Sequence, residues 1–167
     1  MQLAEEIRYL LLAVQREGNR TLSEALSPVG LTPSQGEVLR VLQNYQPISL
    51  SELGSLLVCE SGGSPSRLVN GLVTAGLVQR VISSHDRRYV TLTLTRQGEE
   101  RATQVAAVEE LLHQQLEQLI QDVPIAEVME MFWRYIENRP AGKALARRTK
   151  RNTLPHQTQE GKMTNEL

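Results

Sequence analysis

Apolar residues recur at helical spacing along most of the chain and alternate with polar residues in only one short region. Spacings of three and four residues predict helices over about 3–26, 33–45, 50–58, 64–76, 96–121 and 125–138. Between the fourth and fifth helices, apolar and polar residues alternate in two short runs, 77–82 and 89–94, which predicts a β-hairpin. The pattern therefore predicts a mainly α-helical fold with a small β-hairpin.

The order of these elements is that of a winged helix-turn-helix, a shape that reads duplex DNA. Two helix starts carry a capping box, Thr32 with Gln35 and Ser49 with Glu52. The winged lobe is predicted over residues 32–95. The helix that follows it would be roughly 40 Å long for about 27 residues, which exceeds what a small domain needs.

Polar residues on one side of the fourth helix are candidates for contacts with DNA. Ser64 followed by Pro65 favours a helix start there, over a start one turn earlier. Ser64, Ser66, Arg67 and Asn70 then lie on or near the exposed side. Hydroxyls and amides can donate to phosphates, arginine can bind guanine, and asparagine can bind adenine. A solvated polar face is the ordinary alternative, but the place of this helix in the motif favours DNA.

A charged turn joins the two predicted strands. Arg87 and Arg88 are suited to enter a narrow minor groove, where the potential is most negative. Asp86 can hold a neighbouring arginine through a charge-assisted hydrogen bond, a wing-supporting role. The alternative is an ordinary charged hairpin turn.

The charge is close to balanced overall but unevenly distributed. The formal net charge is −1, yet residues 61–96 hold five arginines and one acidic residue. Residues 140–167 hold six basic and two acidic residues with few large apolar ones, which predicts a flexible basic tail. A DNA-binding face needs this kind of local positive potential rather than a high overall charge.

Several stretches, in the right order over about residues 3–138, resemble the MarR family of bacterial transcription regulators. They are Asp86-Arg87-Arg88 followed by Leu94-Thr95, Thr95-Arg96-Gln97-Gly98, Leu31-Thr32-Pro33-Ser34-Gln35, and Ser66-Arg67-Leu68-Val69 with Ala75-Gly76-Leu77-Val78-Gln79-Arg80. The resemblance implies a single domain over 1–139 that forms a homodimer. Residues 1–27 and 96–139 would be its dimerisation helices.

The resemblance also implies a function. The chain would be a sequence-specific regulator that binds double-stranded DNA at a pseudo-palindromic operator in the cytoplasm of a bacterium. Most relatives are repressors released by a small aromatic or phenolic ligand. Three features depart from the family pattern: Gly62-Gly63 replaces larger residues, Gly71 lies inside the recognition helix, and Arg67 is the only basic residue of that helix. The two adjacent glycines and the sparse charge motivate the alternative of a dimeric interaction module with weak or no specific DNA binding.

Other chemistry finds little support in the sequence. The lone cysteine, Cys59, is expected to be a small, inert, buried residue, with a redox-responsive regulator as the alternative. The three histidines lack ligand spacing, so neither a metal site nor a cofactor is expected, and no catalytic motif indicates an enzyme. No signal peptide or membrane-spanning run is expected. Aromatic and methionine residues near 129–135 are assigned to a core or dimer interface rather than to a ligand pocket.

Overall fold

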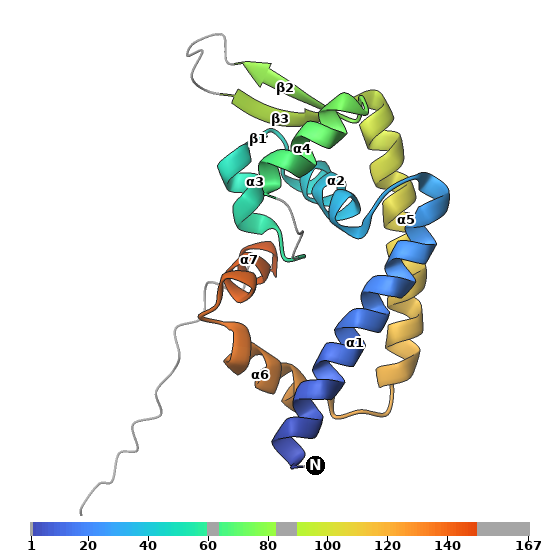
Figure 1. The fold of residues 1–167 in the computed structure, drawn as a ribbon, viewed down its shortest axis with the longest axis vertical. Helices are drawn as coiled ribbons and strands as arrows, with labels where there is room; N and C mark the ends of the chain where they lie inside the picture. Colours follow the sequence, from blue (N-terminus) through green and yellow to red (C-terminus); the bar gives the residue numbers. More distant parts are fainter. Residues whose placement is uncertain (1, 60–63, 83–89, 150–167) are drawn as a thin grey trace, which may run out of the picture.

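The computed structural model describes residues 2–59, 64–82 and 90–149. The elements follow one another as α1 Leu3–Leu26, η1 Ser27–Val29, α2 Pro33–Tyr45, β1 Ile48–Ser49, α3 Leu50–Leu56, α4 Pro65–Thr74, β2 Val78–Ile82, β3 Val90–Leu94, α5 Arg96–Ile120, α6 Ile125–Ile136 and α7 Pro140–Thr149. A lobe of α2, α3, α4 and the strands occupies one end (Figure 1). From it α1 and α5 extend side by side, and α6 and α7 return toward α3.

The strands form an antiparallel sheet in the order β1-β3-β2. Val78 lies opposite Leu94, so the predicted hairpin is confirmed. The sequence pattern missed β1, in which Ile48 lies opposite Leu92. Two residues are too few to show an alternation, and this strand exists only because β3 offers it a partner.

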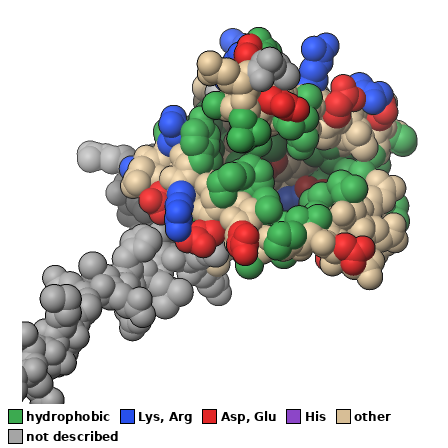
Figure 2. Space-filling view, turned by 90° about the horizontal axis from the view of Figure 1, so that it is seen from below, with side chains coloured by type: hydrophobic (Ala, Val, Ile, Leu, Met, Phe, Trp, Pro, Cys, Tyr) green, Lys and Arg blue, Asp and Glu red, His purple; other side chains and the backbone are tan. Residues whose placement is uncertain are grey.

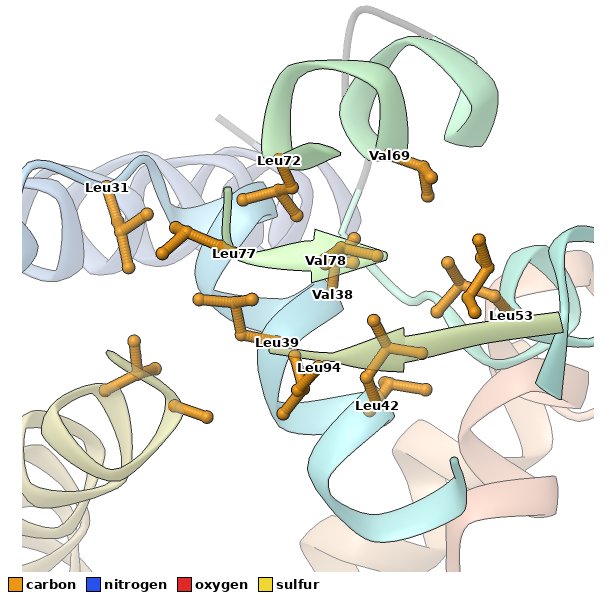
Figure 3. Packing of buried hydrophobic residues seen from close by; sticks show 14 of the residues in the cluster. Leu31, Val38, Leu39, Leu42, Leu53, Val69, Leu72, Leu77, Val78 and Leu94 are labelled. Atoms are coloured by element: carbon orange, nitrogen blue, oxygen red, sulfur yellow. The ribbon is translucent and has the colours of Figure 1, made fainter. Parts of the chain in front are cut away.

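The hydrophobic core lies between α2, the sheet, α4 and the first half of α5 (Figure 3). Its fully buried larger side chains are leucines and valines, because the chain has few aromatic residues: Leu26, Val38, Leu39, Val41, Leu42, Leu53, Val69, Leu72, Leu92 and Val105. Helix α2 contributes four of them and packs against α4, α3 and α5. It is therefore the element against which the rest of the lobe is placed.

The helix starts read from the sequence are confirmed. The hydroxyls of Thr32 and Ser49 each accept the backbone N–H three residues on, and the side chains of Gln35 and Glu52 each accept the N–H of the cap residue. Helix α4 begins at Pro65, the start that the sequence favoured. The cap bonds fix two of these helix starts without help from distant residues, and Pro65 at the first position favours the third.

Thr95 and Gly98 join the hairpin to α5 by a close approach of the backbone. The Thr95 hydroxyl donates to the carbonyl oxygen of Gly76 (2.7 Å) and accepts the backbone N–H of Gly98 (3.0 Å). The Thr95 N–H donates to the Leu77 carbonyl oxygen (3.1 Å). A Cβ on residue 98 would lie only 1.9 Å from that same oxygen. Glycine at this position therefore lets the first turn of α5 rest directly on the start of the wing.

Residues 140–149 form helix α7, so the prediction of a flexible tail beginning at residue 140 is wrong for this part. Gly142 and Ala144 are buried, and Arg148 forms an ion pair with Glu37. Composition misled because α7 packs through small side chains and arginine bonds rather than through large apolar residues. The remainder of the predicted tail, 150–167, lies outside the described residues.

Candidate nucleic-acid interface

Helix α4 presents the predicted contact residues on its outer side. Its inner side is fixed by Val69 and Leu72, which are fully buried in the core. Ser64, Arg67 and Asn70 are exposed, whereas Ser66 is half-buried. The backbone carbonyl of Ser64, not its hydroxyl, accepts the hydrogen bonds of the first turn of α4. The structure therefore brings these residues to one side of α4, with the Ser64 hydroxyl not used in capping that helix.

Arg80 on β2 belongs to the same surface and was not among the site residues chosen from the sequence. Its guanidinium Nη2 donates to the side-chain oxygen of Asn70, and both residues are exposed. This bond ties the wing to the recognition helix and sets a second positive charge beside the face of α4. The signal available in the sequence was a charged residue at a position where the alternation calls for an inward-facing one, because Arg80 shares the strand face of the buried Val78 and lies opposite the buried Leu92.

The predicted wing-tip residues Asp86, Arg87 and Arg88 lie outside the described residues, as do Gly62 and Gly63. The strands that lead to and from the tip are paired to their ends, with residue 82 opposite residue 90. The roles assigned to the three tip residues stay predictions.

Glu37 on α2 holds the chain where it leaves α3, another feature that the sequence did not reveal. Only 7% of this residue is exposed. Its carboxylate accepts the backbone N–H of Val58 (2.8 Å) and of Cys59 (2.9 Å), and it pairs with the Arg148 guanidinium (2.7 Å). A buried carboxylate requires such partners, and here it receives three N–H groups. An acidic residue among the apolar positions of α2 was the signal for it.

Cys59 is exposed, so the expectation of a buried cysteine is wrong. Partial burial of the thiol is the main cause that raises the pKa of Cys59 to about 11, and the negative charge of Glu37 is the second cause. A thiol with a raised pKa holds little thiolate at neutral pH, which fits the expected inertness and weakens the redox alternative.

A second surface consists of apolar side chains that this chain leaves uncovered. Helix α1 exposes a stripe in which Leu10 is 57% exposed, and the second half of α5 exposes Leu119 at 77%. No residue of α6 is buried, although one face of it is strongly apolar, with Met129 and Phe132 on it. Seen from this end of the molecule, hydrophobic side chains surround a hollow (Figure 2). The α6 residues are therefore not part of the core of a single chain.

Nowhere in 2–59, 64–82 or 90–149 do three His, Cys, Asp or Glu side chains gather so that they could hold a metal ion. Within the same ranges, each helix is too short or too polar to cross a membrane.

Comparisons with known proteins agree with this geometry. A family described as a winged helix DNA-binding domain matches residues 31–98. The multiple antibiotic resistance protein MarR of Escherichia coli is 32% identical over 105 residues, which cover 63% of this chain and 67% of that protein. A helix-turn-helix-type transcriptional regulator of Bacillus cereus is 32% identical over 106 residues, and the match spans 64% of this chain and 65% of that relative.

The solved structures include a mutant of Escherichia coli MarR in complex with operator DNA. It superposes with a TM-score of 0.68 at 28% identity, over 81% of this chain and 99% of that one. The apo form of wild-type MarR gives a TM-score of 0.60 at 27% identity, over 81% and 98% of the two chains. Together with the identity to MarR over two thirds of its length, these matches show that the chain belongs to the MarR family.

Proposed function

We propose that this chain is a transcriptional regulator that binds double-stranded DNA sequence-specifically as a homodimer. The observation that carries the proposal is the exposed polar side of α4, which carries Arg67 and Asn70, with Arg80 of the wing bonded to Asn70. The solved complex of a MarR mutant with operator DNA supports it, since that protein shares the fold at 28% identity. A bacterial regulator of this kind acts in the cytoplasm.

The dimer would form through the uncovered apolar faces of α1, α5 and α6. Side chains exposed to this extent along three helices are a liability for a monomer and are typical of an interface. A two-fold dimer would place its two recognition helices in successive major grooves, about 34 Å apart, on a pseudo-palindromic operator.

Each contact residue has a chemical role in this proposal. Arg67 would bind guanine or a phosphate, and Ser64 would donate its hydroxyl to a phosphate. Asn70 can bind adenine only if its carbonyl oxygen is released by Arg80, because that oxygen accepts the adenine amino group. Arg80 would then turn to a phosphate. Arg87 and Arg88 would enter the minor groove, with Asp86 supporting one of them.

Release by a small aromatic or phenolic ligand is part of the proposal. A groove of about 710 Å³ lies between the end of α3 and α7, with Leu57, Val58, Cys59, Pro140 and Ala144 among its lining residues. That volume suits a small molecule. A ligand there would favour conformations in which the two lobes no longer match successive grooves, so repression would end by a shift of population.

The test is selection of bound sequences from a random duplex pool by the purified full-length protein. We expect a pseudo-palindromic consensus, and an affinity that falls with salt with a slope of about −0.9 per phosphate contact in log K against log salt. Arg67→Ala and Arg80→Ala should each weaken binding. Arg20→Ala is the matched control, because Arg20 is an exposed arginine on α1 that pairs with Glu17 and Glu24.

The alternative is a dimeric interaction module with little specific DNA binding. One observation favours it: Arg67 is the only basic residue of α4, and the side-chain oxygen of Asn70 is already occupied by Arg80. If the selection enriches no particular sequence and the protein binds every duplex equally weakly, the alternative is supported and the operator-binding proposal is rejected.

A further inference from the structure

Helix α7 is folded back against the rest of the chain by small residues at its start. Gly142 lies so close to the end of α6 that a Cβ there would be 1.9 Å from the Ile136 carbonyl oxygen. Ala144, further along, is 4% exposed. These close contacts bring α7 beside α3, as seen in Figure 1. The first half of α7 is therefore packed closely against the rest of the chain.

Two arginines near the end of α7 then reach the helix-turn-helix. The Arg147 guanidinium donates to the carbonyl oxygen of Ser55 at the end of α3 (3.0 Å). The Arg148 guanidinium pairs with Glu37 on α2 (2.7 Å), and the Arg148 carbonyl oxygen accepts the hydroxyl of Tyr45 (3.3 Å). Basic residues that resemble a phosphate-binding tail in the sequence thus have protein partners here.

Glu37 connects α7 to the segment that leads into the recognition helix. Its two carboxylate oxygens accept the N–H groups of Val58 and Cys59, the last described residues before Ser64, which directly precedes α4. One side chain of α2 therefore holds both the exit of α3 and the end of α7.

We propose that Glu37 and Arg148 form a latch through which α7 fixes Val58 and Cys59 at the exit of α3, and so positions α3 and the recognition helix packed against it for binding DNA. The inference rests on the proposed function. Arg148 and Glu37 would be positioning residues that act through the backbone of Val58 and Cys59, and neither needs to touch DNA.

The burial of the pair gives the latch its strength. The side chain of Glu37 is 8% exposed and that of Arg148 is 32% exposed, so salt screens this pair less than an ion pair on the open surface. Removing Arg148 leaves a buried negative charge with only its two backbone partners. Such a carboxylate gains by moving toward water, and that movement stretches the bonds to Val58 and Cys59.

The experiment compares Arg148→Gln with Lys143→Gln in the full-length protein. Lys143 is exposed on the same helix, so both variants lose one positive charge. We expect Arg148→Gln to speed the hydrogen exchange of the Val58 and Cys59 amides about tenfold, as local opening becomes easier. DNA affinity should fall about tenfold with an unchanged salt slope, because no phosphate contact is lost. Lys143→Gln should leave the exchange rates unchanged.

A conservative variant separates positioning from general stability. Arg148→Lys keeps the charge beside Glu37 and should restore most of the amide protection and of the DNA affinity. Far-UV circular dichroism at the assay temperature checks that each variant is folded.

The possible contrary results are distinct. Unchanged exchange of both amides in Arg148→Gln would overturn the latch. A salt slope smaller by about 0.9 with unchanged exchange would instead make Arg148 a phosphate contact. Because the exchange measurement needs no DNA, failure of the latch and failure of the proposed DNA binding are told apart.

Discussion

Replacing Gly98 by alanine tests the contact between α5 and the wing most directly. The new Cβ would lie 1.9 Å from the Leu77 carbonyl oxygen, 2.9 Å from the Leu77 carbonyl carbon and 3.3 Å from the Cβ of Leu94. An ordinary carbon–oxygen contact is about 3.3 Å, so the two backbones must separate by roughly 1.4 Å. The obstacle is backbone in the middle of the fold, and it cannot rotate away as a flexible side chain would.

The expected cost follows from what that separation disturbs. Overpacking of a well-packed site typically costs about 1 to 3 kcal/mol. The hydrogen bond from Thr95 N–H to the Leu77 carbonyl oxygen is also stretched, which costs about 1 kcal/mol. Alanine returns up to about 1 kcal/mol through its better helix propensity. The net loss is about 2 kcal/mol in the free energy of unfolding, or a Tm lower by about 4 to 8 °C.

The assay is thermal and urea denaturation followed by circular dichroism at a fixed protomer concentration, because dimerisation would make the Tm depend on concentration. Gly71→Ala is the matched control. It is also a glycine to alanine change inside a helix, but an added Cβ there meets no atom within 4 Å. This control should gain up to about 1 kcal/mol. If Gly98→Ala is as stable as the wild type, within about 0.5 kcal/mol, the argument from close backbone packing is wrong.

Three further outcomes are expected. Leu10→Glu places a charge in the apolar stripe of α1 and should shift the protein from dimer to monomer in analytical ultracentrifugation; a persistent dimer would remove α1 from the interface. The alkylation rate of Cys59 should rise about tenfold per pH unit toward its pKa of about 11, whereas a plateau near pH 8 to 9 would show an ordinary thiol. Gly142→Ala should release α7, because its Cβ would meet the Ile136 carbonyl oxygen, and trypsin should then cut at Arg147 faster than in the wild type; equal cutting rates would contradict this packing.

The elements that were predicted well are those whose signals are local. The capping boxes at Thr32 and Ser49, and the cap at Thr95, involve residues three apart, so the sequence displays them directly. The alternation of the two longer strands was equally visible. The exposed side of α4 followed from its helical period, which buries Val69 and Leu72 and leaves Arg67 and Asn70 outside.

The parts that were missed depend on contacts between residues of different elements. Arg80 meets Asn70 across the gap between β2 and α4. Glu37 and Arg148 are separated by 111 positions. No spacing rule connects such pairs, because their distance is set by how the elements pack. The α7 residues were predicted to be a flexible tail for the same reason. The small Gly142 is buried only because it packs against the end of α6, and the sequence does not display that contact.

By itself, the sequence determined the order and type of the main elements, the winged helix-turn-helix arrangement and the resemblance to the MarR family. Helical and strand periods, caps and the wing signature involve residues that are close in the sequence. Their interactions form whatever the rest of the chain does, and so the sequence displays them. Only the tertiary structure decided that Glu37 is a buried partner of Arg148, that Cys59 is exposed, and that α6 fully buries none of its residues within its own chain. Burial and long-range ion pairs arise when elements meet, and so they become visible only in the folded chain.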